Sequence, residues 1–477
     1  MTVVFSGQRL VLAASLGLAL FAVVAHGCLL AGLAVSPWLL PMALLAGAIA
    51  ARRPPVASAD DAPRALRWVV VLMLLFVLAA VTYGALATPS RHWDGAVAWD
   101  TTARCLADQL SLEQPYFRDA AVFAHSRDYP LLQPLLMASL ERLVGAPGGR
   151  LVFPAILALF ALSVGVAAAR ATRHSALAWL LSLAAGTTPA LVSPTNGGID
   201  SGYGDALLLL CTTTMAAGLL VADWRWLASG ALLAVMSKPE GLVYAGAAAL
   251  VAFCMQERRL LMAAAGGWLL GAGLWLPLQR ELQQPGMAID RWAVPGAVLT
   301  VAVAIVIAEG VARWFGWRAR GRIAAVVAVL AVLLLALPFL PSASSGAHGA
   351  MAAYLGRLGT WPQQLPRLWE SLLGTVRFGL LRGGFTLAFW LPLLGLPWLP
   401  RLSAQGRGLC AFLLLGVLIV QVPFVLSPVA DLQQPLRSSM PRLLLHWLGA
   451  ALLLGGVLLA AGSRRSAEAE AHGERAA

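Results

Sequence analysis

Long apolar runs dominate the chain, and short polar segments separate them. An apolar helix of about 20 residues crosses a bilayer, and helices that break inside a protein can be shorter. On this pattern fourteen membrane segments are predicted, near residues 10–32, 34–50, 68–88, 151–169, 175–192, 204–222, 226–237, 241–256, 260–278, 293–312, 323–341, 380–400, 409–427 and 443–462. The pattern therefore predicts an all-α polytopic membrane protein with about 12–14 spans.

Composition narrows the class of protein. Hydrophobic residues make up 60% of the 477 residues and charged residues only 12%, which excludes a water-soluble multidomain enzyme. The net charge of +12 comes from arginines scattered between the apolar runs, without a basic stripe that contains aromatic residues. We therefore expect these arginines to set membrane topology, and we expect no nucleic-acid partner.

The arginines in short loops predict the orientation. With the N-terminus in the cytoplasm, the arginine-rich loops all fall on the cytoplasmic side, as the positive-inside rule requires. The opposite face receives the large loop 89–150 and the shorter loops 193–203, 279–292, 342–370 and 428–442, together with the turn around Lys238. We predict three parts: a membrane hairpin with a cytoplasmic linker (1–67), a transmembrane domain that carries the loop 89–150 (68–462) and a disordered cytoplasmic tail (463–477).

The first large outer loop is rich in acidic residues. Seven of the 22 acidic residues lie in this loop: Asp94, Asp100, Asp108, Glu113, Asp119, Asp128 and Glu141. Insertion into a membrane does not require so many carboxylates. We therefore expect this loop to carry chemistry.

The loop is predicted to begin with an interfacial amphipathic helix. From Trp99 onward, the apolar positions 99, 103, 106 and 110 share one helical face, while Asp100, Arg104 and Asp108 follow one another at intervals of four on another face. The two aspartates are interpreted as ion-pair partners of Arg104. Asp94 precedes this helix directly after a span and has no local cation, so it is either a helix N-cap or a reactive carboxylate at the membrane surface.

A second polar segment of the loop starts at His125 and leads into an apolar helix that ends near Leu143. Pro130 suits the first turn of this helix, and His125, Asp128 and Tyr129 lie in the entry loop. One interpretation is structural, with Asp128 near the helix N-terminus and His125 on the surface. The other is a site for proton abstraction beside a lipid phosphate.

Lys238 is the only lysine of the chain, and it lies in a turn between two short apolar segments, followed by Pro239, Glu240 and Gly241. Short segments that meet at such a break place polar groups at membrane depth. Because charges there are costly unless they are used, Lys238 is predicted to bind a phosphate, and Glu240 to pair with it. The alternative is a lysine that extends from a helix end to the interface.

Several polar residues near the later spans have simpler interpretations. Arg442, and less directly Arg437, are candidates for the same phosphate or for anchors at the membrane interface. Asp200 and Asp205 are expected to cap the following span, and Asp205 is also a candidate for sugar binding. His446 is expected to be a hydrogen-bonded core residue.

Five short motifs lie on the predicted outer face: Trp93-Asp94, Asp128-Tyr129-Pro130-Leu131, Gly202-Tyr203-Gly204-Asp205, Ser237-Lys238-Pro239-Glu240-Gly241 and the stretch Arg437 to His446. Together they resemble the GT-C class of glycosyltransferases. The closest likeness is to the protein mannosyltransferase and lipid A aminoarabinose transferase superfamily of bacterial inner-membrane enzymes. It covers roughly residues 68–260 and, more weakly, 428–460, and it implies that the transmembrane domain 68–462 is catalytic.

The resemblance implies an inverting glycosyltransferase with a GT-C-like helical bundle. It would move a sugar from a polyprenyl-phosphate donor to the hydroxyl of a lipid, glycan or protein acceptor, on the outer face of the bacterial inner membrane. Asp94 matches the family's essential carboxylate and would be the general base. Gly95 stands where the family has an acidic pair, and Pro130-Leu131 stands where it has Pro-Pro, so acceptor and metal dependence stay open.

Two alternatives and one cofactor question follow from the same residues. A transporter or lipid flippase also needs intramembrane charges and broken helices, and a polysaccharide polymerase or ligase also uses lipid carriers.

We expect no cofactor and no metal site, because the outer loops contain no Asp-x-Asp motif and no His pair at ligand spacing. A divalent cation shared by Asp94 and Asp128 is a minority alternative. Tyr354, Trp361 and Trp369 are candidates for stacking on a sugar ring or for an interfacial aromatic belt.

Overall fold

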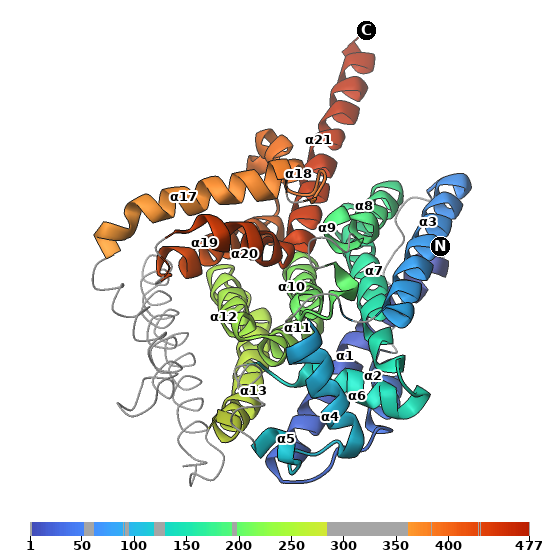
Figure 1. Ribbon diagram of the computed structural model, residues 1–477. Helices are drawn as coiled ribbons and strands as arrows, with labels where there is room; N and C mark the ends of the chain where they lie inside the picture. Colours follow the sequence, from blue (N-terminus) through green and yellow to red (C-terminus); the bar gives the residue numbers. More distant parts are fainter. Residues whose placement is uncertain are drawn as a thin grey trace.

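The computed structural model describes residues 2–51, 62–88, 90, 95–118, 129–192, 198–283, 361–382, 384–427, 429 and 431–476. The elements in these residues are helices, and Figure 1 shows them gathered into one bundle from which the end of α21 projects. The longer helices are α1 (Thr2–Leu30), α2 (Leu39–Ala50), α3 (Arg64–Ala87), α6 (Leu132–Val144), α7 (Val152–Thr172), α8 (Ser175–Thr187), α10 (Asp205–Leu220), α11 (Trp224–Ser237), α12 (Pro239–Cys254), α13 (Arg258–Gln283), α17 (Leu365–Val376), α19 (Ala404–Val425), α20 (Gln433–Leu445) and α21 (Leu448–Ala476).

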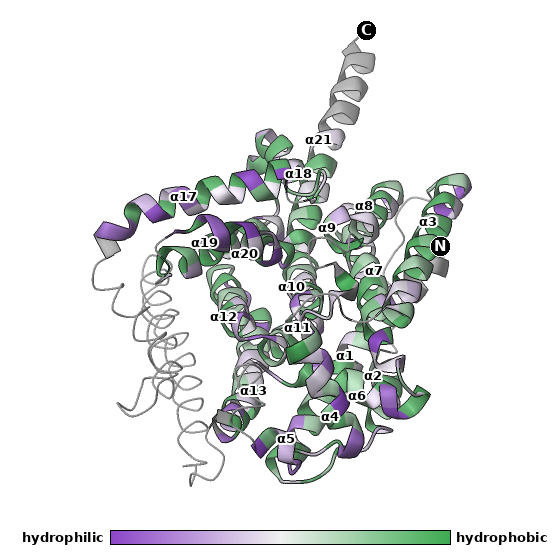
Figure 2. Cartoon of the chain, viewed as in Figure 1, coloured by the Kyte–Doolittle hydropathy of each residue, from purple (hydrophilic) through white to green (hydrophobic). Residues whose placement is uncertain are grey.

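The length and hydropathy of these helices identify a multi-pass membrane protein. Six helical stretches of the described chain are long and apolar enough to cross a membrane, and the bent pair α20 and α21 raises the number to seven. The helices α2, α10 and α12 are apolar but shorter. Figure 2 shows apolar residues along most of the bundle, with hydrophilic residues at α4 (Thr101–Gln109) and α5 (Pro115–Arg118) and also along α17. The predicted all-helical polytopic class is confirmed at this level, whereas the predicted spans 293–312 and 323–341 lie outside the described residues.

Contacts between distant segments agree with the predicted alternation of loops. On the predicted outer side, the Val35 N–H donates to the Leu110 carbonyl oxygen (2.8 Å), and the Ala190 N–H donates to that of Gly384 (2.9 Å). On the predicted inner side, the Arg170 side chain reaches Asp223 at 3.4 Å. Segments assigned to one face thus lie together, which is what an alternating chain requires.

The region 380–400 differs from the single span predicted for it. It contains the end of a π-helix (Arg377–Arg382), the short helix α18 (Trp390–Leu394) and a 3₁₀-helix (Leu396–Arg401). Gly384 has a φ of +72°, and prolines at 392, 397 and 400 each remove a backbone donor. The apolar composition of this stretch is therefore not accompanied by a continuous helix.

The disordered tail predicted for residues 463–477 stays a prediction. In the structure α21 extends to Ala476. Ala and Glu are strong helix formers, and a tail that extends an existing helix does not bear the cost of nucleation.

The predicted amphipathic helix of the outer loop is present as a π-helical turn (Gly95–Asp100) followed by α4. Its apolar face is almost fully buried: Trp99, Ala103, Leu106 and Leu110 are each no more than 3% exposed. This face packs against α6 (Leu132–Val144). The helix therefore covers the bundle with its apolar face turned toward protein.

Candidate functional site

The entry into α10 is a glycine-rich segment, residues 198–204, that the first outer loop holds in place. The Ser90 hydroxyl donates to the Ser201 carbonyl oxygen at 2.9 Å, and the fully buried Gln133 amide donates to the Gly202 carbonyl oxygen at 2.9 Å. Gly202 has a φ of +84°, a left-handed conformation that favours glycine. The outer loop and the start of α10 therefore form one packed unit.

Trp99 brings the π-helical turn against the same segment. A Cβ atom on Gly204 would lie 2.8 Å from Cζ2 of Trp99 and 3.2 Å from Cγ of Lys238, so only a glycine leaves room for both side chains. The ring of Trp99 lies 5.1 Å from that of Tyr129. Tyr129 and Lys238 thus both lie close to Trp99.

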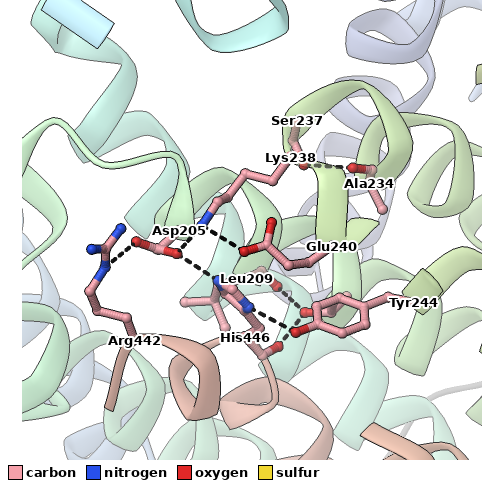
Figure 3. A network of polar contacts seen from close by, with 10 residues as sticks. Asp205, Leu209, Ala234, Ser237, Lys238, Glu240, Tyr244, Arg442 and His446 are labelled. Atoms are coloured by element: carbon pink, nitrogen blue, oxygen red, sulfur yellow. Dashed lines mark hydrogen bonds and ion pairs between the residues drawn. The ribbon is translucent and has the colours of Figure 1, made fainter. Parts of the chain in front are cut away.

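Asp205 is the centre of a buried polar cluster (Figure 3). Its Oδ1 accepts a hydrogen bond from the Lys238 ammonium at 2.7 Å and lies 2.8 Å from Nε2 of His446, and its Oδ2 accepts from Nε of Arg442 at 2.9 Å. The side chain of Asp205 is 3% exposed, that of Lys238 5% and that of His446 0%. Burial of this kind is tolerated because each charge meets a partner of opposite sign or a hydrogen-bonding group.

Three helix interruptions bring these side chains together. Asp205 is the first residue of α10, Lys238 separates α11 from α12, and His446 lies in the bend between α20 and α21. The axes of α20 and α21 differ by 56°. Pro239 is the first residue of α12, where it does not remove an intrahelical hydrogen bond. Interrupted helices of this type place polar groups at membrane depth.

A second layer of contacts fixes the cluster. The Tyr244 hydroxyl lies 3.2 Å from Nδ1 of His446, and the Thr212 hydroxyl donates to the His446 carbonyl oxygen that the helix bend leaves unused. A neutral His446 satisfies both of its ring contacts when Nε2–H donates to Asp205 and Nδ1 accepts from Tyr244. Glu240 lies 3.4 Å from the Lys238 ammonium.

The charges of the cluster cancel while His446 is neutral. Lys238 and Arg442 supply two positive charges, and Asp205 and Glu240 supply two negative charges. The side chains of Arg442 and Glu240 are 23% and 32% exposed, so they mark the accessible side. The Arg442 guanidinium also lies over the ring of Tyr203, 3.7 Å from its centroid. The arrangement holds two cations in a fixed position beside an accessible edge.

Several of the predicted phosphate-binding residues lie together. Lys238, Glu240 and Arg442 share the cluster, and Tyr129 is adjacent through Trp99. The predicted general base Asp94, and also His125 and Asp128, lie outside the described residues. Among the other candidates, Arg437 is exposed, Trp369 is 64% exposed and Tyr354 lies outside the described residues.

The role predicted for Asp205 is wrong in one respect. The N-cap of α10 is Gly204, without a side-chain capping bond, and the Asp205 carboxylate is directed to Lys238, Arg442 and His446 instead. His446 is a buried, hydrogen-bonded residue as expected, but its partners were not evident. Its partners Asp205 and Tyr244 are separated from it by 241 and 202 residues, so no local sequence pattern reports the contacts.

Asp100 differs from its predicted pairing with Arg104. It is 7% exposed, and its ion pair is with Arg150 at 4.0 Å. Burial raises the pKa of Asp100 above its ordinary value, and the nearby positive charge of Arg150 offsets this only in part. Asp100 is therefore buried in the protein, whereas Arg104 is exposed.

Among the residues that the structure describes, no group of three His, Cys, Asp or Glu side chains could hold a metal ion. Comparisons with protein-family models, with curated proteins and with solved structures found no match to this chain.

Proposed function

We propose that this chain is an inverting, GT-C-like glycosyltransferase that takes a sugar from a polyprenyl-phosphate carrier. The observation that supports the proposal most is the cluster of Lys238 and Arg442 around Asp205, next to a packed and acidic outer loop. A lipid-linked donor suits a site at a membrane surface, where its phosphate can meet fixed cations. The finer features of the fold, a GT-C-like arrangement with 12–14 spans, belong to this proposal.

In the proposed reaction the acceptor hydroxyl attacks the anomeric carbon while the bond to the phosphate oxygen breaks. The hydroxyl proton passes to Asp94, which acts as the general base. The bonding electrons leave with the polyprenyl phosphate, which gains a negative charge. Lys238 and Arg442 stabilise that charge, and Asp205 and Glu240 hold the two cations in position. Tyr129, His125 and Asp128 would contribute to binding the substrates beside this phosphate.

The test compares strains that lack the gene and carry either the wild-type gene or a variant. Lipid and glycan analysis of the deletion strain identifies the acceptor that loses its sugar and the carrier lipid that accumulates. Asp94→Asn is expected to lower transfer by about 10²–10⁴-fold without changing the amount of protein in the membrane. Asp108→Asn, in the same loop but exposed, is the matched control and should restore transfer fully. Normal transfer by Asp94→Asn would refute the proposed base.

A proton-coupled transporter is the second candidate, and one observation favours it. His446 lies between Asp205 and Tyr244 in a fully buried chain of hydrogen bonds at a helix bend, and such chains of titratable groups occur in proton relays. In proteoliposomes, a transporter would carry protons with its substrate, and Asp205→Asn would abolish this while Asp94→Asn would not. The transferase predicts the loss of sugar transfer in Asp94→Asn.

A further inference from the structure

A groove of about 990 Å³ runs between α1, α11 and α13, away from the Asp205 cluster. Its walls are mostly aliphatic, with Leu16, Leu20 and Val23 from α1, Leu232 from α11 and Met262 and Leu270 from α13. Leu20 is 42% exposed and Leu270 is 48% exposed, so the groove opens on the lateral surface of the bundle. In a membrane protein this surface faces lipid.

The floor of the groove is formed by a glycine, Gly266, which has no side chain to fill it. Met262, Gly266 and Leu270 follow at intervals of four on one face of α13 and are exposed, whereas residues 263–265 are buried. A Cβ atom on Gly266 would meet nothing within 4 Å. Gly266 therefore leaves an open depression between two larger side chains.

One end of the groove is cationic. Arg225, Arg258 and Arg259 line it together with Trp224. Arg225 is engaged by Asp223, which also contacts Arg170 at 3.4 Å. Arg258 and Arg259 are exposed and occupy the first two positions of α13. This end lies on the predicted cytoplasmic side of the chain.

The two arginines lie at a helix N-terminus, where their charges add to the partial positive charge of the helix end. Such a position favours negative groups and disfavours cations. The first turn of α13 has no acidic residue, and Glu257 immediately before it supplies one exposed carboxylate beside two arginines. An anion at this end would interact favourably with the arginines and with the helix terminus at once.

The length of the groove matches one leaflet. From Arg258 to Leu270 it follows thirteen residues of α13, and the twelve steps between them correspond to about 18 Å at 1.5 Å per residue. Half of a hydrocarbon core is about 15 Å. An acyl chain whose headgroup lies at Arg258 and Arg259 would therefore extend to about the midplane of the bilayer.

We propose that this groove binds an anionic phospholipid of the cytoplasmic leaflet, with its acyl chain over Gly266 and its phosphate at Arg258 and Arg259. Basic pockets between membrane helices on the cytoplasmic side are suited to such headgroups. The site is separate from the Asp205 cluster and does not depend on the proposed transferase activity.

The first test fills the groove. Full-length protein is purified in mild detergent, and bound lipid is measured by native mass spectrometry after addition of phosphatidylglycerol or phosphatidylcholine. The wild type is expected to retain phosphatidylglycerol preferentially. Gly266→Leu should lose this retention, because the leucine side chain occupies the depression without a clash. Ala79→Leu, at an exposed position of α3 outside the groove, is the matched control and should bind like the wild type.

The second test removes the charge. Arg258→Gln and Arg259→Gln are each expected to weaken phosphatidylglycerol binding about fivefold and to leave phosphatidylcholine binding unchanged. Arg64→Gln, at the corresponding first position of α3, is the matched control and should have no effect.

Three outcomes would overturn the proposal. The first is equal retention of the neutral and the anionic phospholipid by the wild type. The second is undiminished phosphatidylglycerol retention in Gly266→Leu. The third is retention of an added polyprenyl phosphate in preference to phosphatidylglycerol, which would assign the groove to a different lipid. If Gly266→Leu gives too little protein to measure, phosphatidylglycerol binding by Arg258→Gln tests the proposal independently.

Discussion

At the scale of single residues, the candidate site depends on Asp205. Its carboxylate is the common partner of Lys238, Arg442 and His446, and it is almost inaccessible to solvent. Removal of one partner from a buried ion pair costs more than removal of both, because the remaining charge is left without compensation. The cluster should therefore respond to substitutions in a strongly non-additive way.

The substitution Asp205→Asn is expected to destabilise the folded protein by about 3–5 kcal/mol, because it leaves the Lys238 ammonium buried beside a neutral side chain. The double variant Asp205→Asn with Lys238→Met should recover part of this loss. Thermal unfolding in detergent, followed by fluorescence of the tryptophans, measures both effects. The single variant Lys238→Met completes the double-mutant cycle, and a loss in the double variant equal to the sum of the two single losses would show that the two side chains do not interact.

Individual residues could be predicted from the sequence only where a local signal existed. Lys238 is conspicuous as the only lysine between two short apolar segments, and Glu240 and Arg442 were assigned to the same site from similar local signals. Asp205 is a candidate from the sequence only as a helix cap or for sugar binding, because its contacts with Arg442 and His446 span more than 200 residues. The sequence therefore indicates both cations of the cluster, but not that the Asp205 carboxylate holds them.

At the scale of helices, the termini and interruptions determine where polar groups lie. The loop between α10 and α11 gives an example outside the membrane segments. Asp223 caps α11 through the Arg225 N–H and also binds the Arg225 guanidinium. Burial by itself raises the pKa of Asp223, but the hydrogen bonds and charge of Arg225 and the charge of Arg170 outweigh it and hold the pKa below its ordinary value.

A lowered pKa means that the ionised form of Asp223 stabilises the folded state. This contribution is complete above the ordinary value of 3.8 and is lost as the pH falls through the lower folded-state value. Asp223→Asn should therefore lower stability by about 1–3 kcal/mol at pH 7. In thermal unfolding between pH 3 and 7, the difference in stability between the wild type and Asp223→Asn should become smaller only at the acidic end of this range. A difference that does not depend on pH would contradict this assignment.

Helices could be predicted from the hydrophobic pattern where nothing in the backbone interrupts an apolar stretch. The prediction was wrong where prolines or a glycine with a positive φ interrupt it. The predicted spans at 68–88 and 409–427 correspond to α3 and α19. The stretch 380–400 is equally apolar, but Gly384 and its prolines interrupt it. A hydropathy window does not register the loss of backbone donors or a positive φ.

At the scale of the whole molecule, the arginine distribution predicts a single orientation. The cluster around Asp205 joins three segments that this orientation assigns to the outer face: the loop before α10, the turn at Lys238 and the region of Arg442. The large outer loop packs against the first of them. The site should accordingly be accessible from outside the cytoplasm.

Cysteine labelling tests this orientation. In a variant without the five native cysteines, Gln434→Cys at the start of α20 is expected to react with a membrane-impermeant maleimide on intact cells. Arg64→Cys at the start of α3 should react only after permeabilisation. Both positions are exposed, so a difference in reaction reports the side of the membrane and not burial. The reverse pattern would invert the topology and place the site in the cytoplasm.

The packing of the outer loop on residues 198–204 limits how this protein could be re-engineered. Ser90 and Gln133 bind carbonyl oxygens of that segment, and Trp99 occupies the space that Gly204 leaves. A chimera that receives loop 89–150 from another protein would keep these contacts only if it also received the matching segment before α10. Grafting the loop alone would disturb the position of Asp205, so the two stretches should be exchanged as one cassette.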